Sequence, residues 1–440
     1  MANKTLIKGA QVVTMDERLG DFASADILVE NGAIAAVGPS LAAADAQTID
    51  AANMIALPGI IDAHTCLWQT VLRGSVPDLW AGTYGTKLLP WRRGYTAEDN
   101  YNAAYVGAHE ALSYGTTTIV DYCHNIHGPG YADASIKALK ESGIRHLFEH
   151  SFMSPPGDTF RTLDERLTEG KRVYETFHDP KSLTSIGFGT DSIGSPDIAR
   201  QLAFARGYKA PSCIHVNETG TVERLNAEGL LGPDFTVVHG NLLSNAELDM
   251  MAKARMPLCF TPTADVNGTP ADVVRRARDR GIDVVFGCDI PCSVATDTLG
   301  QLRIMFNVQG FLDGAMERSF SSVIGRRPPL RPGMPLLPPR ELIRIATIVA
   351  ARVLGLDDKI GSLTPGKRAD IVLIDKGPFG DSIEPDACAH VVLQTSPRDI
   401  DTVMVDGNIR TRGGVLAGFD PERATSMIRA SRQRILGEGL

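Results

Sequence analysis

The sequence lacks any apolar run that approaches the roughly 18 residues of a transmembrane helix, so we expect no membrane partner. Its first residues, Met1 to Thr5, lack the apolar core of a secretion signal. Basic residues are fewer than acidic ones, 44 against 52, and the net charge of −8 argues against nucleic acid as a partner. The seven cysteines show no repeating spacing, which excludes a disulfide framework and favours a reducing cytoplasm.

Both ends of the chain carry short β-strand patterns. Asn31-Gly32 stands between two of them and is typical of a type I′ hairpin turn. Because the two ends resemble each other and differ from the middle, we expect one small β-sandwich domain built from residues 1–56 and 361–440. The expected strands are 7–14, 26–30, 34–38, 369–374 and 403–408, and a surface helix is expected over 421–436.

The middle of the chain, residues 57–360, alternates apolar strand-like runs with helical segments. This pattern predicts an α/β fold, a (β/α) barrel of the TIM type, with a doubly wound open sheet as the alternative. In a barrel of this type the chemistry lies at the carboxyl ends of the strands. The runs end near Asp62, Asp121, Ser151, Thr190, Glu218, Gly240, Thr261 and Asp289, and helices are expected to open at Thr96, Ser195, Ser244 and Thr269.

The first barrel strand ends in the most informative motif of the chain. Its apolar run reaches His64, and Cys66 follows two residues later. Residues i and i+2 of a strand point to the same face, so both side chains can project into one cavity. Imidazole and thiolate both suit zinc and similar divalent ions, and the pair therefore predicts a metal site.

Three later strands end in residues of the same chemical kind. The fifth places His215 before Glu218, the sixth ends at His239 and the eighth at Asp289. A single histidine at a strand end is more often structural, but a set at strands one, five, six and eight is specific. We therefore expect a metal-dependent hydrolase.

This set, with its flanks, resembles the amidohydrolase superfamily, and within it the cytosine deaminase and triazine (atrazine) hydrolase branch. The resemblance covers nearly the whole chain, including 58–64, Leu72-Arg73-Gly74 and the closing string 361–370. It implies one divalent metal, zinc or alternatively iron. It implies that the ligands are His64, Cys66, His215 and Asp289, that Glu218 shuttles protons, and that His239 polarises or protonates the substrate, with Asp289 also acting as a base.

Cys66 departs from the family, which has histidine there. Cysteine remains a ligand in one interpretation. In a second, the site binds metal weakly or not at all, and in a third Cys66 is a nucleophile paired with His64 or His239. His124, which follows the second strand, is either a substitute ligand, a substrate contact or a surface-loop residue.

Few residues in the sequence indicate which substrate binds. The loop 68–91 holds all three tryptophans, and Trp68 and Trp80 can stack on an aromatic heterocycle or pack the loop. Arg73 and Asp191 are candidate polar contacts, although Arg73 can equally hold the loop by a salt bridge. The proline- and arginine-rich segment 326–339 is a lid, a subunit contact or a long surface loop.

These observations lead to one expected function and two alternatives. We expect a deaminase-type hydrolase that acts on a C–N bond of a small cyclic or aromatic compound, in a cytoplasmic homo-oligomer; the oligomer is an analogy with the family. The alternatives are a metal-free lyase or isomerase that keeps the acid–base groups, and a non-catalytic relative.

Overall fold

The protein is described by a computed structural model that covers residues 4–77, 82–190, 197–266, 272–312, 337–382 and 386–437. Within these ranges no helix combines the length and apolar character that crossing a membrane requires. The predicted helix starts at Ser195 and Thr269 and most of the segment 326–339 lie outside the described residues.

Eight parallel strands form a barrel in chain order, as predicted. The first and last strands meet through a bridge between Thr65 and Asp289, and the Cys66 N–H donates to the Asp289 carbonyl at 2.8 Å. This closure excludes the open-sheet alternative. The strands are β6 (Ile60–Thr65), β7 (Thr116–Cys123), β8 (Arg145–Ser151), β9 (Thr184–Gly189), β10 (Ser212–Val216), β11 (Phe235–His239), β12 (Leu258–Phe260) and β13 (Val284–Phe286).

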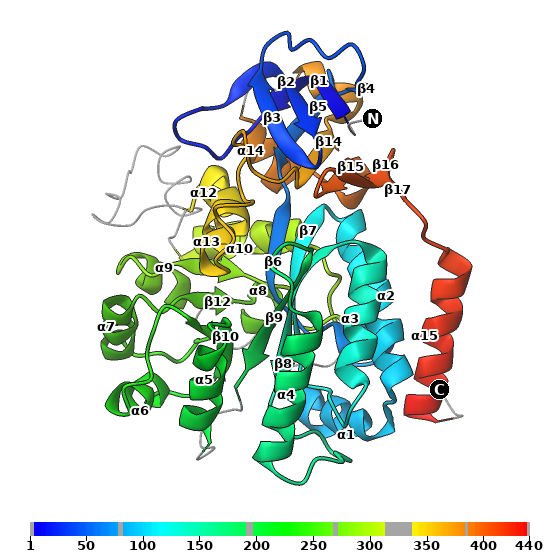
Figure 1. Ribbon diagram of the computed structural model, residues 1–440. Coiled ribbons are helices and arrows are strands. Elements are labelled where there is room, and N and C mark those ends of the chain that lie inside the picture. The colour runs from blue at the N-terminus through cyan, green and yellow to red at the C-terminus, as the bar shows by residue number, and fades with distance from the viewer. Residues whose placement is uncertain are drawn as a thin grey trace.

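Helices surround the barrel (Figure 1). The Thr96 and Ser244 hydroxyls accept the backbone N–H groups of Asp99 and Glu247, so both predicted helix starts are confirmed as capping boxes. The longer helices are α2 (Ala97–Ser113), α3 (Tyr131–Ser142), α4 (Leu163–Phe177), α5 (Ile198–Gly207), α6 (Thr221–Ala227), α7 (Asn245–Ala254), α9 (Val273–Arg278), α10 (Thr298–Leu312), α12 (Pro339–Arg344) and α15 (Pro421–Leu436). The remaining helical segments are η1 (Leu67–Leu72), η3 (Tyr84–Leu88), α1 (Leu89–Trp91), η4 (Arg92–Gly94), α8 (Pro262–Asp265), η5 (Ile345–Val349), α13 (Ala350–Val353), η6 (Gly377–Ser382), α14 (Ala387–Ala389), η7 (His390–Gln394) and η8 (Pro397–Asp399).

Strands from both chain ends form a separate mixed sheet, which confirms that the two ends build one β unit; in the described residues the expected sandwich is a single sheet of nine strands. Asn31 and Gly32 both have positive φ, 52° and 78°, as the type I′ turn requires. The ends join where β5 pairs antiparallel with β14. The strands are β1 (Lys4–Val12), β2 (Phe22–Glu30), β3 (Ala33–Gly38), β4 (Gln47–Asp50), β5 (Met54–Pro58), β14 (Ile371–Asp375), β15 (Ile400–Val405), β16 (Asn408–Arg412) and β17 (Val415–Leu416).

The sheet faces the amino ends of the barrel strands (Figure 1). Gly59 links β5 to β6, and a Cβ there would lie 2.0 Å from the Thr117 hydroxyl, so only glycine fits the crossing. The carboxyl ends of the strands are therefore free of the sheet and open toward the loops. The exact domain limits at residues 56 and 360 stay a prediction.

A buried ion pair joins the two units. Arg145, the first residue of β8, donates from Nε and Nη2 to both carboxylate oxygens of Asp370, at 2.8 and 3.0 Å. The Arg145→Met variant leaves the buried Asp370 charge without its partner, so we expect a loss of about 3–5 kcal/mol in the free energy of unfolding. Urea unfolding measures it, with the exposed pair variant Arg352→Met as control. Equal midpoints for the two variants would contradict the prediction.

Candidate functional site

Three predicted residues converge at the carboxyl end of the barrel. The Nε2 atom of His64 lies 3.3 Å from His215 Nε2 and 3.5 Å from Asp289 Oδ1. Strands β6 and β10 bring the histidines, and Asp289 follows β13. Two imidazole nitrogens and a carboxylate oxygen thus meet at one place, an arrangement that a shared cation or proton satisfies.

Cys66 joins this group. Its thiol donates to Asp289 Oδ1 over 3.8 Å, and one ligand atom each from His64, Cys66 and Asp289 lies within 4.8 Å of the others. Burial raises the pKa of the Cys66 thiol, and the nearby carboxylates raise it further. A bound cation acts in the opposite direction because it stabilises the thiolate. A divalent metal therefore fits the nitrogen, sulfur and oxygen donors present.

His239 has a carboxylate partner that the sequence did not indicate. Its Nδ1 atom lies 3.0 Å from Asp265 Oδ1 and 3.2 Å from the Thr261 hydroxyl. Burial lowers the pKa of His239, but the Asp265 charge and hydrogen bond dominate and raise it to about 9. Its imidazolium is therefore the stable form at neutral pH. Burial raises the pKa of Asp289, but the His64 hydrogen bond and the positive charge of His239 together lower it.

The backbone is strained at two of these residues. His239 and Asp289 have φ of 71° and 63°, in the left-handed region that side chains other than glycine seldom adopt. Such strain concentrates where a structure holds functional groups in place. Here His239 ends β11 and Asp289 follows β13 after a short turn, so both residues lie at the carboxyl end of the barrel.

Other predicted residues have different surroundings. The structure does not bring Glu218 to the cluster: its side chain is 74% exposed, and Arg224 Nη2 is 4.0 Å from its carboxylate. Arg73 pairs with Glu110 of α2 at 2.6 Å, which is the salt-bridge role that the sequence left open. Trp80 and Asp191 lie outside the described residues.

Trp68 and His124 lie beside the cluster. The indole of Trp68 is buried and meets the His124 ring edge to face, with centroids 5.1 Å apart. The His124 Nδ1 atom is 3.7 Å from Cys66 Sγ. His124 is therefore a buried neighbour of the cluster, which excludes its interpretation as a surface-loop residue.

Sequence reasoning missed a buried carboxylate within the barrel. Glu149 of β8 accepts the Cys213 thiol at 3.0 Å, and one ligand atom each from these two residues and His64 lies within 4.8 Å of the others. Burial raises the pKa of Glu149 to about 7. A glutamate two residues before the expected strand end at Ser151 was the available signal.

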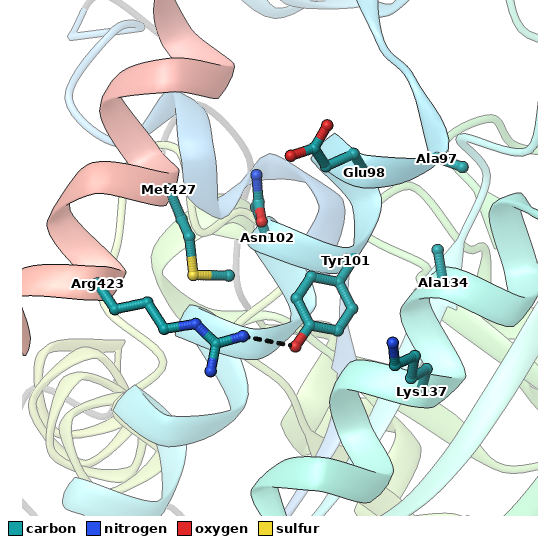
Figure 2. A pocket seen from close by; sticks show the side chains of 8 residues that line it. All are labelled: Ala97, Glu98, Tyr101, Asn102, Ala134, Lys137, Arg423 and Met427. Carbon is teal, nitrogen blue, oxygen red and sulfur yellow. Dashed lines mark hydrogen bonds between the residues drawn. The ribbon is translucent and has the colours of Figure 1, made fainter. Parts of the chain in front are cut away.

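A separate open groove of about 470 Å³ lies between α2, α3 and α15 (Figure 2). Arg423 donates to the Tyr101 hydroxyl at 3.0 Å and stacks over Tyr105. This groove lies on the outside of the barrel, and none of the residues that line it belongs to the cluster.

Comparison with known proteins gives concordant results. The model of the Amidohydrolase family matches residues 55–410. A 5'-deoxyadenosine deaminase of Methanothermobacter thermautotrophicus is 26% identical over 98% of this chain and 99% of its own. A 5-methylthioadenosine/S-adenosylhomocysteine deaminase of Symbiobacterium thermophilum is 26% identical over 92% and 93%, respectively.

Solved structures share the fold. Atrazine chlorohydrolase TrzN from Arthrobacter aurescens TC1, complexed with zinc, has a TM-score of 0.82 at 23% identity and covers 97% of this chain and 99% of its own. An adenosine deaminase from Xanthomonas campestris with bound zinc has a TM-score of 0.83 at 20% identity, with 99% of both chains covered. The predicted family, barrel fold and enzyme class, a hydrolase of carbon–nitrogen bonds, are thereby confirmed.

Proposed function

The chain belongs to the amidohydrolase family, and we propose that it hydrolyses the bond between a ring carbon and an exocyclic amine, acting as a metal-dependent deaminase. The convergence of His64, Cys66, His215 and Asp289 carries this proposal, because the donors present suit a single divalent cation. The deaminase names of the relatives support an amino-substituted heterocycle as the substrate class. We infer zinc as the metal, with iron as the alternative.

When bound, the cation supplies an acidified water and a Lewis acid for the substrate. His64, Cys66, His215 and Asp289 would hold it. Asp289, whose pKa is lowered, remains a carboxylate at neutral pH and accepts a proton from the attacking water. His239, kept protonated by Asp265, donates a hydrogen bond to the charge that develops on the substrate.

Glu218 completes the proposed chemistry. It carries a proton to the departing amine, so that water and the amine become a ring carbonyl and ammonia. In the structure its carboxylate faces solvent near Arg224, so this role requires the loop after β10 to turn it inward when substrate binds. Cytoplasmic location and homo-oligomeric assembly stay predictions.

The proposed function is tested by ammonia release from a panel of amino-purines, amino-pyrimidines and amino-triazines in H₂¹⁸O. Metal-loaded protein is expected to release one ammonia and incorporate one ¹⁸O per turnover, and chelator-treated protein neither. Turnover that does not depend on metal, or a product that contains no ¹⁸O, would instead support the metal-free lyase or isomerase.

The Asp265–His239 pair predicts a pH effect. The raised pKa of His239 means that its charge is present below about 9 and is lost as the pH rises through that value. Asp265→Asn removes the stabilising charge and leaves burial, which lowers the pKa. The alkaline limb of the kcat/KM profile is therefore expected to move to lower pH, with roughly a 10²-fold loss at pH 8. Asp272→Asn, which alters an ion pair with Arg276 on α9, is the control. A lower rate with an unmoved limb would show that Asp265 only positions the ring.

A further inference from the structure

Arg92 is a buried cation for which the described residues provide no carboxylate partner. Only 2% of the residue is exposed to solvent. In the described part of the chain, its guanidinium forms no ion pair with an Asp or Glu side chain. Two other buried arginines contrast with it: Arg145 pairs with Asp370, and Arg166 pairs with Asp158. A buried guanidinium is costly unless an opposite charge accompanies it.

The contacts that Arg92 does make are neutral. Nη2 donates to the His124 carbonyl, Nε donates to Asn125 Oδ1 at 3.4 Å, and Nη1 lies 4.0 Å from the Met153 sulfur. The distances to Asn125 and Met153 are long for hydrogen bonds, and a thioether sulfur is a weak acceptor. The guanidinium therefore keeps hydrogen-bonding capacity as well as an uncompensated charge.

A second unused donor adjoins it. The Arg92 guanidinium carbon lies 5.6 Å from the centroid of the Trp68 ring. Trp68 is buried, and its indole N–H has no hydrogen-bond partner among the residues that the structure describes. Buried donors are rarely left unpaired, so an orphaned one next to an unneutralised cation points to a missing acceptor that is an anion.

These two donors border the proposed metal site. His124 receives the Arg92 hydrogen bond, meets the Trp68 ring at 5.1 Å, and places Nδ1 3.7 Å from Cys66 Sγ. The exposed fraction of Arg92 is close to that of the cluster residues, because His64 and Cys66 are each 1% exposed. A ligand that reaches the metal site therefore also comes close to Arg92.

We propose that Arg92 and the Trp68 indole bind a carboxylate group of the substrate, which makes the substrate an amino-heterocycle that carries a carboxylate. This inference rests on the proposed function and adds its substrate class. One guanidinium and one indole N–H match the single charge and two oxygens of a carboxylate. A phosphate dianion has more acceptor oxygens and charge than these two donors satisfy.

Two other roles for Arg92 make different predictions. If its charge instead compensates a Cys66 thiolate, then loss of the charge weakens metal binding. If Arg92 only holds the segment 92–94 in place through its hydrogen bond to the His124 carbonyl, then its substitution weakens the binding of charged and neutral ligands equally. Neither alternative distinguishes a carboxylate from its amide, and this difference is the basis of the test.

The experiment measures binding to metal-loaded protein by calorimetry, with probes that cannot be deaminated. The probes are nicotinate, isonicotinate and pyrimidine-5-carboxylate, each compared with its carboxamide. The variants are Arg92→Met, Arg92→Lys and Trp68→Phe, with the exposed neighbour variant Arg93→Met as control. Metal content is determined for every variant.

Wild-type protein and Arg93→Met are expected to prefer at least one carboxylate over its amide. Arg92→Met should weaken carboxylate binding by about 10- to 100-fold and leave amide binding and metal content unchanged. Trp68→Phe and Arg92→Lys should cause smaller losses of the same selectivity, and they keep the test valid if Arg92→Met does not fold. Metal loss in Arg92→Met, equal losses for acid and amide, or no carboxylate preference in wild type would each overturn the proposal.

The outcomes also separate this inference from the proposed function. If the protein deaminates neutral heterocycles and shows no preference for carboxylates, then the proposed deaminase function is supported and the proposed carboxylate site is wrong. If carboxylate binding depends on Arg92 but no amino-heterocycle releases ammonia, then the carboxylate site is supported and the proposed deaminase function is wrong.

Discussion

Cys66→Ser is expected to lower the metal content from about one divalent ion per chain to near zero and to abolish activity with it. The thiol is fully buried and lies within 4.8 Å of the other ligand atoms, whereas a serine hydroxyl stays protonated at neutral pH and is a poor zinc ligand. Without metal, water keeps its ordinary pKa, so we expect a loss of more than about 10³-fold in kcat/KM. Elemental analysis of protein purified without chelators, in parallel with the rate, measures both.

Two further variants make the result specific. Cys259→Ser makes the same exchange at another buried position of the barrel, and it is expected to keep the metal. Cys66→His supplies a neutral nitrogen ligand in place of a thiolate, so the metal should remain and its bound water should become more acidic. Full activity of metal-free Cys66→Ser protein would exclude Cys66 as an essential ligand. A wild type that binds no metal even after reloading would favour the metal-free lyase or isomerase.

Glu218→Gln is expected to lower kcat by about 10²- to 10⁴-fold with little change in metal content, because glutamine cannot carry a proton to the leaving amine. The variant retains the size of the side chain, and residue 218 is exposed, so stability should not change. Steady-state kinetics with the substrate found in the ammonia screen, together with elemental analysis, separates the two effects.

Glu223→Gln, an exposed glutamate of α6, is the matched control and should match wild type. An active Glu218→Gln enzyme would show that this residue does not transfer the proton. The role would then pass to a carboxylate at the cluster, either Asp289 or the buried Glu149, whose pKa of about 7 allows it to exchange protons near neutral pH.

The barrel was predictable from the sequence because its signals are local. Each apolar run that was expected to end near a residue such as Ser151 or Thr190 is a strand that ends within a few residues of it, at Ser151 for β8 and Gly189 for β9. The cap residues Thr96 and Ser244 began their helices for the same reason, since capping depends on side chains three residues away. The helix over 421–436 appears with these bounds.

The site was predictable only in part. His64, His215 and Asp289 end or follow strands that the sequence marked, and barrel closure brings such ends together. Asp265 was missed because its pairing with His239 depends on how the short α8 lies against β11. The exposed position of Glu218 follows from the path of the loop after β10, which no residue pattern indicated.

The sequence by itself determined the order of strands and helices, the turn and cap residues, and the kinds of ligand that end the strands, because each depends on residues close together in the chain. Only the tertiary structure decided which charges are neutralised. Arg145 pairs with Asp370 and His239 pairs with Asp265, while Arg92 is buried beside Trp68 and has no carboxylate partner within the described ranges. Electrostatic energies depend on distance and burial in space, and both arise from contacts between residues that lie far apart in the sequence.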